Sequence, residues 1–344
     1  MPSLTIRDIA KLAGVSKSTV SRVLNNTGYV NVDTRRKIEK VIEENDYTPS
    51  ATARSLSKQE TNVIGVIIPE ADNPFFGEIL KGISDVADKN SLSIIFCNTN
   101  NDEEKEKNAL RMLKEQRIKG VILTPATDEK LIQFDSHNKE FIGLVNALEV
   151  PVVLLDRDID YNDWDGIFID NKKGAFDAVN VLIKAGHKKI ATITGDLKLK
   201  IGRERLEGYK EAFKHHCMEI DERYIFEGDF TTDTAYKLAK RIINMEEPPT
   251  AVFTSNNLSN LGFLKAIFET GLRIPEDIAF VGFDNVPLVD IFNINLSVVD
   301  RDTEKMGRMA MELLMKRLND SNDEANSVII SPKLILKGSE KKCE

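Results

Sequence analysis

Histidine and cysteine side chains are the first candidates for catalysis or metal binding in this sequence. The three cysteines are scattered with no C-x-x-C spacing, which argues against a disulfide framework or a thiolate metal site. His187 and the pair His215 and His216 lack an acidic or cysteine partner at ligand spacing. The chain contains no G-x-G-x-x-G after its first predicted strand, no P-loop, no G-x-S-x-G and no H-E-x-x-H. We therefore predict no enzyme activity, no metal and no cofactor.

Side chains near the N-terminus suit a different chemistry, hydrogen bonding to DNA. A helix is predicted to start after Ser16, with Lys17, Ser18, Ser21 and Arg22 on the face opposite its apolar stripe. Lys and Arg donors match the geometry of O6 and N7 of guanine in the major groove. The face is therefore a candidate for reading bases.

Two further predicted helices position that face. The first starts at a capping-box variant, Thr5 to Asp8, and ends at Gly14, which takes a positive φ at little cost. A third helix follows Asp33. Two helices joined by a short glycine-containing turn are typical of the helix-turn-helix, although a small three-helix bundle without DNA binding shows the same pattern.

Net charge alone does not favour a nucleic-acid partner, because the 344 residues carry −8 at pH 7. The charge is uneven, however. Residues 1–60 hold 10 Lys and Arg against 7 Asp and Glu, a net of +3, and the remaining 284 hold 37 against 48, a net of −11. A modestly basic head on an acidic body keeps DNA binding open. With 41% hydrophobic residues, no apolar run of spanning length and no apolar signal segment, we expect a cytoplasmic protein.

From residue 62 onward the sequence alternates buried strands with amphipathic helices. The predicted strands are 63–68, 93–97, 120–124, 151–155, 166–169, 189–194, 251–254 and 278–282. The predicted helices are 75–89, 104–116, 172–185, 203–215, 232–244 and 258–269. Alternation of this kind predicts an α/β fold with parallel sheets covered on both faces. The pattern runs twice, so we expect two doubly wound, Rossmann-like lobes with a cleft between them.

The string from Thr5 to Asn25, TIRDIAKLAGVSKSTVSRVLN, closely resembles the headpiece of the lactose-repressor (LacI/GalR) family. Every fixed position of the pattern T-x-x-D-[VI]-A-x-x-A-G-V-S-x-x-T-V-S-R-V-[LV]-N is filled. The resemblance implies a helix-turn-helix headpiece at 1–46, a hinge helix or linker at 47–60 and an effector-binding and dimerisation domain at 61–344. It places the N-terminal lobe at about 61–160 and 292–322 and the C-terminal lobe at about 163–290 and 325–338, with a fold like that of periplasmic binding proteins.

The resemblance also assigns DNA contacts. Lys17, Ser18 and Arg22 would read bases, and hydroxyl and amide groups would contact phosphates or position the helix. The full set of expected DNA-binding residues is Thr5, Ser16, Lys17, Ser18, Thr19, Ser21, Arg22, Asn25, Tyr29, Ala53 and Leu56. In the family, paired hinge helices fold in the minor groove, where Leu56 would wedge between base steps. By composition alone, residues 47–57 are an ordinary interdomain linker.

Further resemblances place effector contacts at the ends of strands. They are carried by Asn-Pro-Phe-Phe at 73–76, Asp-Arg at 156–157, a G-x₇-R-x₄-G-[FWY] segment, Ser-Asn-Asn at 255–257 and Gly-Phe-Asp at 282–284. Arg301 stands where the family commonly has Gln. The expected effector-binding residues are Asn73, Phe75, Phe76, Asp156, Arg157, Arg203, Phe230, Asn256, Asp284 and Arg301.

This set suits a sugar, because carboxylates and amides bind vicinal hydroxyls and aromatic faces cover the C–H face. Arg157, Arg203 and Arg301 would make the cleft cationic, which favours a pentose or an anionic sugar acid. For Arg301, a salt bridge to Asp300 or Asp302 is an equal alternative.

The resemblance therefore implies a sequence-specific transcriptional regulator, expected to repress a carbohydrate-utilisation operon. Its partners would be a palindromic operator in double-stranded DNA, a small sugar or sugar acid, and a second copy of the chain, since each subunit reads half of the operator. The C-terminus lacks leucine heptads, which favours a dimer. The alternatives are a catabolite-control-type regulator that binds a phosphorylated carrier protein as corepressor and, in another class, a sugar-binding transport protein.

Overall fold

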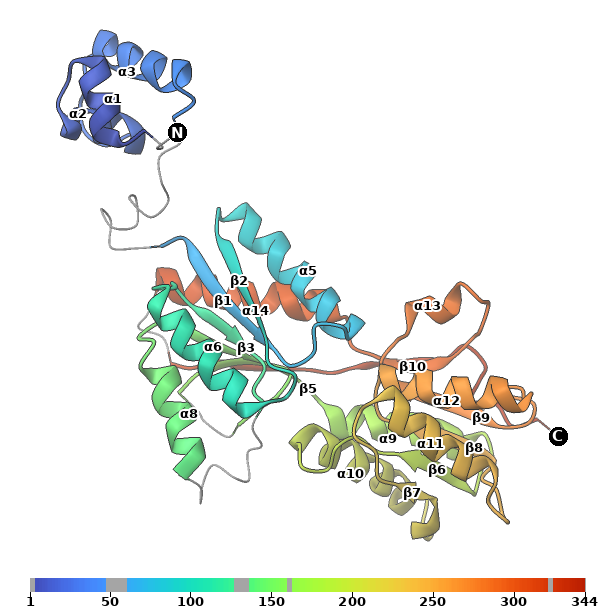
Figure 1. Ribbon diagram of the computed structural model, residues 1–344. Helices are drawn as coiled ribbons and strands as arrows, with labels where there is room; N and C mark the ends of the chain where they lie inside the picture. The colour runs from blue at the N-terminus through green and yellow to red at the C-terminus, as the bar shows by residue number, and fades with distance from the viewer. Residues whose placement is uncertain (1–3, 48–60, 127–135, 160–162, 321–323, 344) are drawn as a thin grey trace. The chain divides into compact units, whose positions relative to one another are not determined.

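The computed structural model describes residues 4–47, 61–126, 136–159, 163–320 and 324–343. The chain divides into two compact units, residues 1–61 and residues 62–344. Each unit has its own hydrophobic core. Figure 1 shows both units and labels most of their helices and strands.

The first unit is a three-helix domain. Its helices are α1 (Ile6–Ala13), α2 (Lys17–Asn25) and α3 (Val32–Glu44). Gly14 ends α1 with φ of 65°, in the left-handed region that glycine adopts without strain. Ser16 then caps α2, its side chain accepting a hydrogen bond from the Thr19 amide. Apolar side chains from all three helices meet in one small core, including Ile9, Val20 and Ile38.

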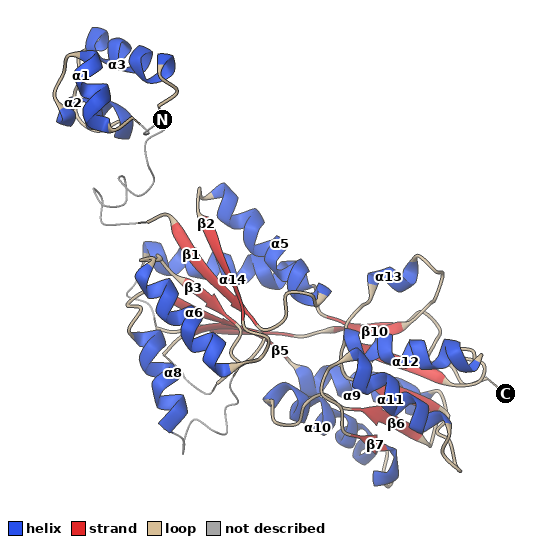
Figure 2. Cartoon of the chain, in the orientation of Figure 1, coloured by secondary structure: helices blue, strands red, loops and turns tan. Residues whose placement is uncertain are grey.

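The second unit contains two six-stranded sheets, drawn in red in Figure 2. The first lobe holds the sheet β11-β5-β4-β3-β1-β2, and the second lobe holds the sheet β12-β10-β9-β8-β6-β7. Every pairing is parallel except β10 with β12. The shared order is doubly wound, so the predicted fold class is confirmed. In such sheets ligands bind beyond the carboxyl ends of the strands, where the strand order reverses.

In the first lobe the strands are β1 (Val63–Ile68), β2 (Ser93–Asn98), β3 (Val121–Leu123), β4 (Val152–Leu155), β5 (Asp165–Ile169) and β11 (Ser327–Ile330). Its helices are α5 (Pro74–Lys89), α6 (Glu103–Glu115), α8 (Ser136–Asn146) and α14 (Thr303–Asn319). The apolar residues of α5 and α14 pack with one face of the sheet, and those of α6 and α8 pack with the other.

In the second lobe the strands are β6 (Ile190–Ile193), β7 (Ile225–Phe226), β8 (Ala251–Thr254), β9 (Ala279–Phe283), β10 (Ser297–Asp300) and β12 (Lys333–Ile335). Its helices are α9 (Asn171–Lys184), α10 (Lys200–His215), α11 (Thr232–Ile243), α12 (Asn257–Thr270) and α13 (Pro287–Asp290), with a 3-10 turn η1 (Glu222–Tyr224). Helices α9 and α10 cover one face, and α11 and α12 cover the other.

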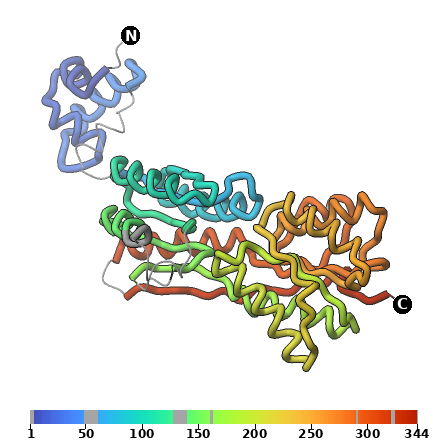
Figure 3. The backbone as a smooth tube through the Cα atoms, turned by 60° about the horizontal axis from the view of Figure 1, so that its bottom comes forward, coloured from blue at the N-terminus to red at the C-terminus, as the bar shows by residue number. Residues whose placement is uncertain are grey.

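The chain crosses between the lobes after β5, after β10 and after β11. Figure 3 shows the last crossing as the red segment that continues from the first lobe into the second. Strands β5 and β11 thus belong to the first lobe and β10 to the second, which differs from the predicted lobe boundaries. Strand β5 is part of the first lobe because it pairs with β4 and β11.

Helices α5 and α14 come from opposite ends of the body sequence and pack closely together, as Figures 1 and 3 both show. Glycine permits this approach. A Cβ added to Gly82 would lie 2.1 Å from the carbonyl oxygen of Glu304, and one added to Gly307 would lie 2.1 Å from that of Ile79. Both distances are far below van der Waals contact, so any side chain at these two positions would push the helices apart.

Candidate functional site

Helix α2 presents a polar face to solvent in the first unit. Lys17, Ser18 and Arg22 are exposed, whereas Val20 and Val23 on the other side of the helix are buried. This separation follows from the 3.6-residue period of a helix. Long cationic side chains on an exposed helix joined to its neighbour by a tight turn have the geometry needed to enter a major groove.

Several other residues predicted to contact DNA make hydrogen bonds to one another within α2 and at its start. At the start of α2, the Ser16 hydroxyl lies 2.7 Å from the Ser18 hydroxyl and 2.8 Å from that of Thr19. Later in the helix, the Asn25 amide donates to the Ser21 hydroxyl over 3.3 Å. These contacts hold the hydroxyls in a local network on one helix.

Thr5 and Tyr29 flank the helix-turn-helix. The Thr5 hydroxyl and amide both donate to the Asp8 carboxylate, at 2.6 and 2.8 Å, and these bonds lower the pKa of Asp8. Thr5 thus acts as a donor to Asp8 in addition to starting the helix. Tyr29 is 86% exposed between α2 and α3 and is available for contact. Ala53 and Leu56 lie outside the described residues.

A cavity of about 420 Å³ lies between the two lobes of the second unit. The loops that follow strands of both sheets line it. Nine predicted effector-binding residues are among its lining residues: Asn73, Phe75, Phe76, Asp156, Arg157, Phe230, Asn256, Asp284 and Arg301. The fold therefore brings together side chains that lie far apart in the sequence. Arg203 is not among the lining residues.

Four lining residues have left-handed backbone conformations. The φ values are 55° for Asn101, 65° for Asp156, 67° for Phe230 and 69° for Asp284. Each costs about 1 kcal/mol or more for a residue with a side chain. Such strained positions persist where the surrounding structure fixes them, and they cluster at ligand sites. Their convergence on one cavity supports a binding role for it.

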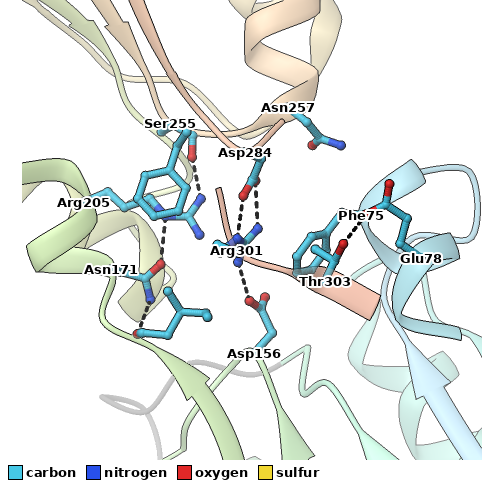
Figure 4. A network of polar contacts seen from close by, with 12 residues as sticks. Phe75, Glu78, Asp156, Asn171, Arg205, Ser255, Asn257, Asp284, Arg301 and Thr303 are labelled. Atoms are coloured by element: carbon cyan, nitrogen blue, oxygen red, sulfur yellow. Dashed lines mark hydrogen bonds and ion pairs between the residues drawn. The ribbon is translucent and has the colours of Figure 1, made fainter. Parts of the chain in front are cut away.

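Arg301 is buried at the centre of the cleft, at the crossing from β10 to α14 (Figure 4). Its Nε and Nη2 donate to the two carboxylate oxygens of Asp284, at 2.5 and 2.8 Å, and its Nη1 donates to Asp156 at 2.7 Å. Burial alone would lower the pKa of the guanidinium, but the charges of Asp284 and Asp156 raise it. The expected alternatives of Asp300 and Asp302 as partners are wrong, since both acceptors come from the ends of other strands.

Arg205, rather than Arg203, is the arginine of α10 that lines the cavity. Its Nε donates to Asn171 at 2.9 Å and its Nη1 donates to the Ser255 carbonyl at 2.5 Å (Figure 4). Ile201, one helical turn before Arg205, also lines the cavity. Arg203 lies midway between these two residues in the sequence, so its side chain points to a different side of α10. Arg203 donates to the Leu197 and Lys198 carbonyls. The arginine that the G-x₇-R-x₄-G-[FWY] segment assigned to the cleft, Arg203, is therefore replaced by Arg205.

Arg205 is confined by its surroundings. Its guanidinium carbon lies 3.9 Å from the centre of the Phe283 ring and 5.7 Å from that of Phe230. Burial, together with the nearby charge of Arg301, lowers the pKa of Arg205 to about 10. The side chain therefore remains charged at neutral pH.

A chain of hydrogen bonds runs through the first-lobe side of the cleft. Arg157 Nη1 donates to Asn101 at 2.7 Å and to the Pro125 carbonyl at 3.0 Å. Asn101 in turn donates to Glu70 at 2.9 Å, and Asn73 donates to the other Glu70 oxygen at 3.0 Å. Burial lowers the pKa of the Arg157 guanidinium. The Glu70 carboxylate is thus already paired with two amides.

The amides of Asn73 and Asn256 hold the cleft's backbone. Asn73 Oδ1 caps α5 through the Phe75 amide at 3.1 Å, and Asn256 Oδ1 caps α12 through the Ser259 amide at 2.9 Å. Asn256 also donates to the Phe230 carbonyl at 3.0 Å, beside that residue's strained backbone. Many of the hydrogen bonds that these two side-chain amides were predicted to make with a ligand are therefore made within the protein.

The aromatic rings of the cleft also contact other groups of the protein. The Arg301 guanidinium carbon lies 3.9 Å from the centre of the Phe75 ring, and Phe76 contacts Phe75 edge to face at 4.9 Å. One face of the Phe75 ring is thus covered by a cation. Phe230 packs against Gly195, where an added Cβ would lie 1.9 Å from the ring.

Among the described residues, contacts between side chains join the lobes across the cleft. Arg301 bridges Asp156 and Asp284, Lys200 Nζ donates to Asp158 at 2.7 Å, and Asn257 Nδ2 donates to Asn73 Oδ1 at 2.8 Å. Asn257 and Arg205 are lining residues that the sequence prediction did not assign as effector contacts. For Arg205 the helical spacing from Ile201 was an available signal.

Similarity to known proteins tests these interpretations. Residues 5–50 match the model described as bacterial regulatory proteins, lacI family, and residues 179–339 match the periplasmic binding protein-like domain. The chain is 36% identical over 333 residues to the HTH-type transcriptional repressor PurR of Vibrio atlanticus (strain LGP32), covering 96% of this chain and 97% of that protein. The chain belongs to the lacI family.

Solved structures of similar proteins agree with this assignment. A Lac repressor dimer bound to operator and the anti-inducer ONPF is 25% identical, covers 99% of this chain and 100% of its own, and superimposes with a TM-score of 0.86. A complex of the transcriptional regulator CelR with cellobiose is 27% identical, covers 98% and 99%, and has a TM-score of 0.72.

The family assignment decides the class of function. This chain is a DNA-binding transcriptional repressor of the lacI family and not an enzyme. Within the described residues, no cluster of three or more His, Cys, Asp or Glu side chains is arranged to hold a metal ion, and no helix is long and apolar enough to cross a membrane.

Proposed function

We propose that this repressor controls a carbohydrate-utilisation operon and that a small sugar or sugar acid in the cleft regulates its binding to DNA. The observation that carries the proposal is the cavity between two lobes, whose lining combines carboxylates, amides, guanidinium groups and aromatic rings. The structural similarity to the CelR–cellobiose complex supports a carbohydrate ligand.

In this proposal, the ligand acts by changing the arrangement of the two lobes. The contacts across the cleft, such as Asp156–Arg301–Asp284, connect the arrangement of the lobes to the occupant of the cavity. A ligand shifts DNA affinity only if it binds the DNA-competent and DNA-incompetent states with different affinities. Residues 47–60, including Ala53 and Leu56, would transmit the change as a hinge.

The proposal also includes a homodimer on a palindromic operator. One headpiece presents one recognition helix, so two-fold symmetry of the operator requires two chains. The second lobe carries three large exposed apolar side chains close together in sequence. Leu288, Ile291 and Phe292 are 59%, 73% and 69% exposed, and burial in a subunit interface would remove them from water.

Fluorescence anisotropy with DNA from upstream of the chain's own gene tests this function. Wild-type protein is expected to bind as a dimer, and Lys17→Gln or Arg22→Gln is expected to weaken binding by about 10-fold to 100-fold. Lys40→Gln is the matched control, since Lys40 is exposed on α3 and pairs with Glu44. Equal losses in all three variants would place the DNA contacts elsewhere than on α2.

A further inference from the structure

The hydrogen-bonding groups of the cleft are unequally satisfied. Asp156 and Asp284 both accept from Arg301, so the carboxylates expected to bind sugar hydroxyls are already engaged. Glu70 accepts from two amides. Asp229 accepts from the hydroxyls of Thr231 and Thr234, both at 2.7 Å. These four lining carboxylates all have donors from within the protein.

Two guanidinium groups of the cleft, in contrast, have donors without acceptors. Arg205 Nη2 and Arg157 Nε are buried and have no hydrogen-bond partner among the described residues. Both arginines line the cavity, Arg205 from the second lobe and Arg157 from the first. A buried donor without an acceptor costs about 1–3 kcal/mol, and more when it is charged. Both atoms have almost no accessible surface, so a ligand recovers this free energy only by drawing the two guanidinium groups toward its acceptor oxygens.

Five charged lining residues are buried, three cations against two anions: Asp156, Arg157, Arg205, Asp284 and Arg301. The less buried part of the lining adds four carboxylates and one cation, from Glu70, Glu103, Asp196, Asp229 and Lys198. The lining as a whole is therefore acidic, and the excess of positive charge is confined to its buried centre. In an interior of low dielectric constant, such an excess is compensated most directly by a counter-ion.

We propose that Arg301 determines the class of ligand: by occupying Asp156 and Asp284 it removes the two buried carboxylate acceptors of the cleft, so the site rejects neutral sugars and takes an anionic one held by Arg205 and Arg157. The inference rests on the proposed function, because it names the ligand class of the same cleft. Carboxylate and phosphate-ester oxygens are both good acceptors for guanidinium groups, so the experiment includes both.

The position of Arg301 supports this role in a second way. Its guanidinium is stacked on the Phe75 ring, where the C–H face of a neutral sugar would otherwise pack. A neutral sugar would have to displace a buried cation from two carboxylates and an aromatic face. An anion bound to Arg205 and Arg157 needs no such displacement.

Isothermal titration calorimetry of the full-length protein tests the inference. The probes are glucose, galactose and ribose as neutral sugars, gluconate, galacturonate and ribonate as their acids, and ribose 5-phosphate. Wild-type protein is expected to bind one of the anionic probes more tightly than its neutral parent by about tenfold or more, with an affinity that falls as salt rises. The acids and the phosphate ester show which anion is preferred.

Arg301→Gln tests the assigned residue. The substitution frees Asp156 and Asp284 to accept hydrogen bonds from sugar hydroxyl groups. The ratio of the affinities for the acid and its neutral parent sugar is therefore expected to fall, because the neutral sugar binds more tightly and the acid more weakly. Because the variant leaves two buried carboxylates facing each other, Asp156→Asn combined with Arg301→Gln is the second variant, and thermal unfolding checks both. Arg223→Gln is the matched control, since Arg223 is exposed and pairs with Asp221.

Three results would overturn the inference: equal or tighter binding of the neutral sugars by wild-type protein, no binding of any anionic probe, or an unchanged preference in folded Arg301 variants. DNA binding by the same preparations separates this failure from that of the proposed function. Protein that binds its operator but prefers a neutral sugar remains a sugar-controlled repressor. Protein that binds no upstream DNA contradicts the proposed function itself.

Discussion

Asn257 Nδ2 donates a hydrogen bond to Asn73 Oδ1 over 2.8 Å, joining two residues 184 positions apart and from opposite lobes. Both side chains are buried, and each is at the start of a helix, α12 and α5. An Asp at position 257 would present an acceptor in place of the donor. The side-chain amide is therefore what allows this direct bond between the lobes.

Asn257→Ala is expected to weaken binding of the tightest-binding probe by about fivefold. The bond contributes roughly 1 kcal/mol to the lobe arrangement seen here, and its loss lowers the population of that arrangement. Calorimetry measures the affinity, and hydrogen exchange at the start of α5 and α12 reports the opening. Asn244→Ala is the matched control, because Asn244 donates only locally, to the Lys240 carbonyl. Unchanged affinity in Asn257→Ala would show that the bond does not stabilise the ligand-binding state.

Arg205→Gln and Arg203→Gln together test which arginine of α10 contacts the ligand: Arg205, as the structure indicates, or Arg203, as the sequence predicted. We expect Arg205→Gln to weaken binding of an anionic probe by about 100-fold or more, since it removes a buried charged donor from the cavity. We expect Arg203→Gln to change it by less than about threefold, because Arg203 itself does not line the cavity and donates to the backbone carbonyls of Leu197 and Lys198. Titration calorimetry measures both. The reverse order would restore the original assignment of Arg203.

Gly82→Ala is expected to lower the free energy of unfolding by about 1–3 kcal/mol, because the added methyl group would overlap the Glu304 carbonyl of α14. Denaturant unfolding monitored by circular dichroism gives the value. Gly77→Ala, in the same helix, is the control: nothing lies within 4 Å of its added Cβ, so higher helix propensity should leave stability unchanged or raised by up to about 1 kcal/mol. Similar destabilisation in the two variants would rule out the close helix contact as the cause.

His187 predicts a pH dependence of stability. Burial lowers the pKa of its imidazole below the ordinary value of about 6.5, so the folded protein binds the proton less readily than the unfolded chain. The stability contributed by the neutral ring is therefore present above the unfolded pKa and is lost as pH falls through the folded pKa. Between about pH 7 and pH 5, wild-type protein should lose more unfolding free energy than His187→Gln, measured by urea denaturation. Parallel pH profiles would contradict this.

Most of the fold was accessible from the sequence because its signals are local. The strand 63–68 is a continuous apolar run, and the structure has β1 at the same residues. The caps at Ser16 and Gly14 follow from residue chemistry, and both appear as expected. Strands β7, β10, β11 and β12 were missed, because they are short and their positions depend on pairing with distant strands.

The cleft shows where sequence reasoning ends. Spacing and resemblance placed Asp156, Asp284 and Arg301 in the same site, and all three line the cavity. Their bonds to one another could not be predicted, because the three residues come from the ends of three strands and meet only in the folded chain. The choice between Arg203 and Arg205 depends on the rotation of α10 about its axis, which a linear motif leaves undetermined.

The central claim is that a ligand in the cleft controls DNA binding, and operator titration with and without ligand tests it most directly. Fluorescence anisotropy with upstream DNA is measured for wild-type protein alone, with the tightest-binding anionic sugar, and with its neutral parent. The account predicts that the anionic sugar changes the dissociation constant for DNA by about tenfold or more while the neutral parent leaves it unchanged. A DNA affinity that stays the same with the cleft saturated would contradict it.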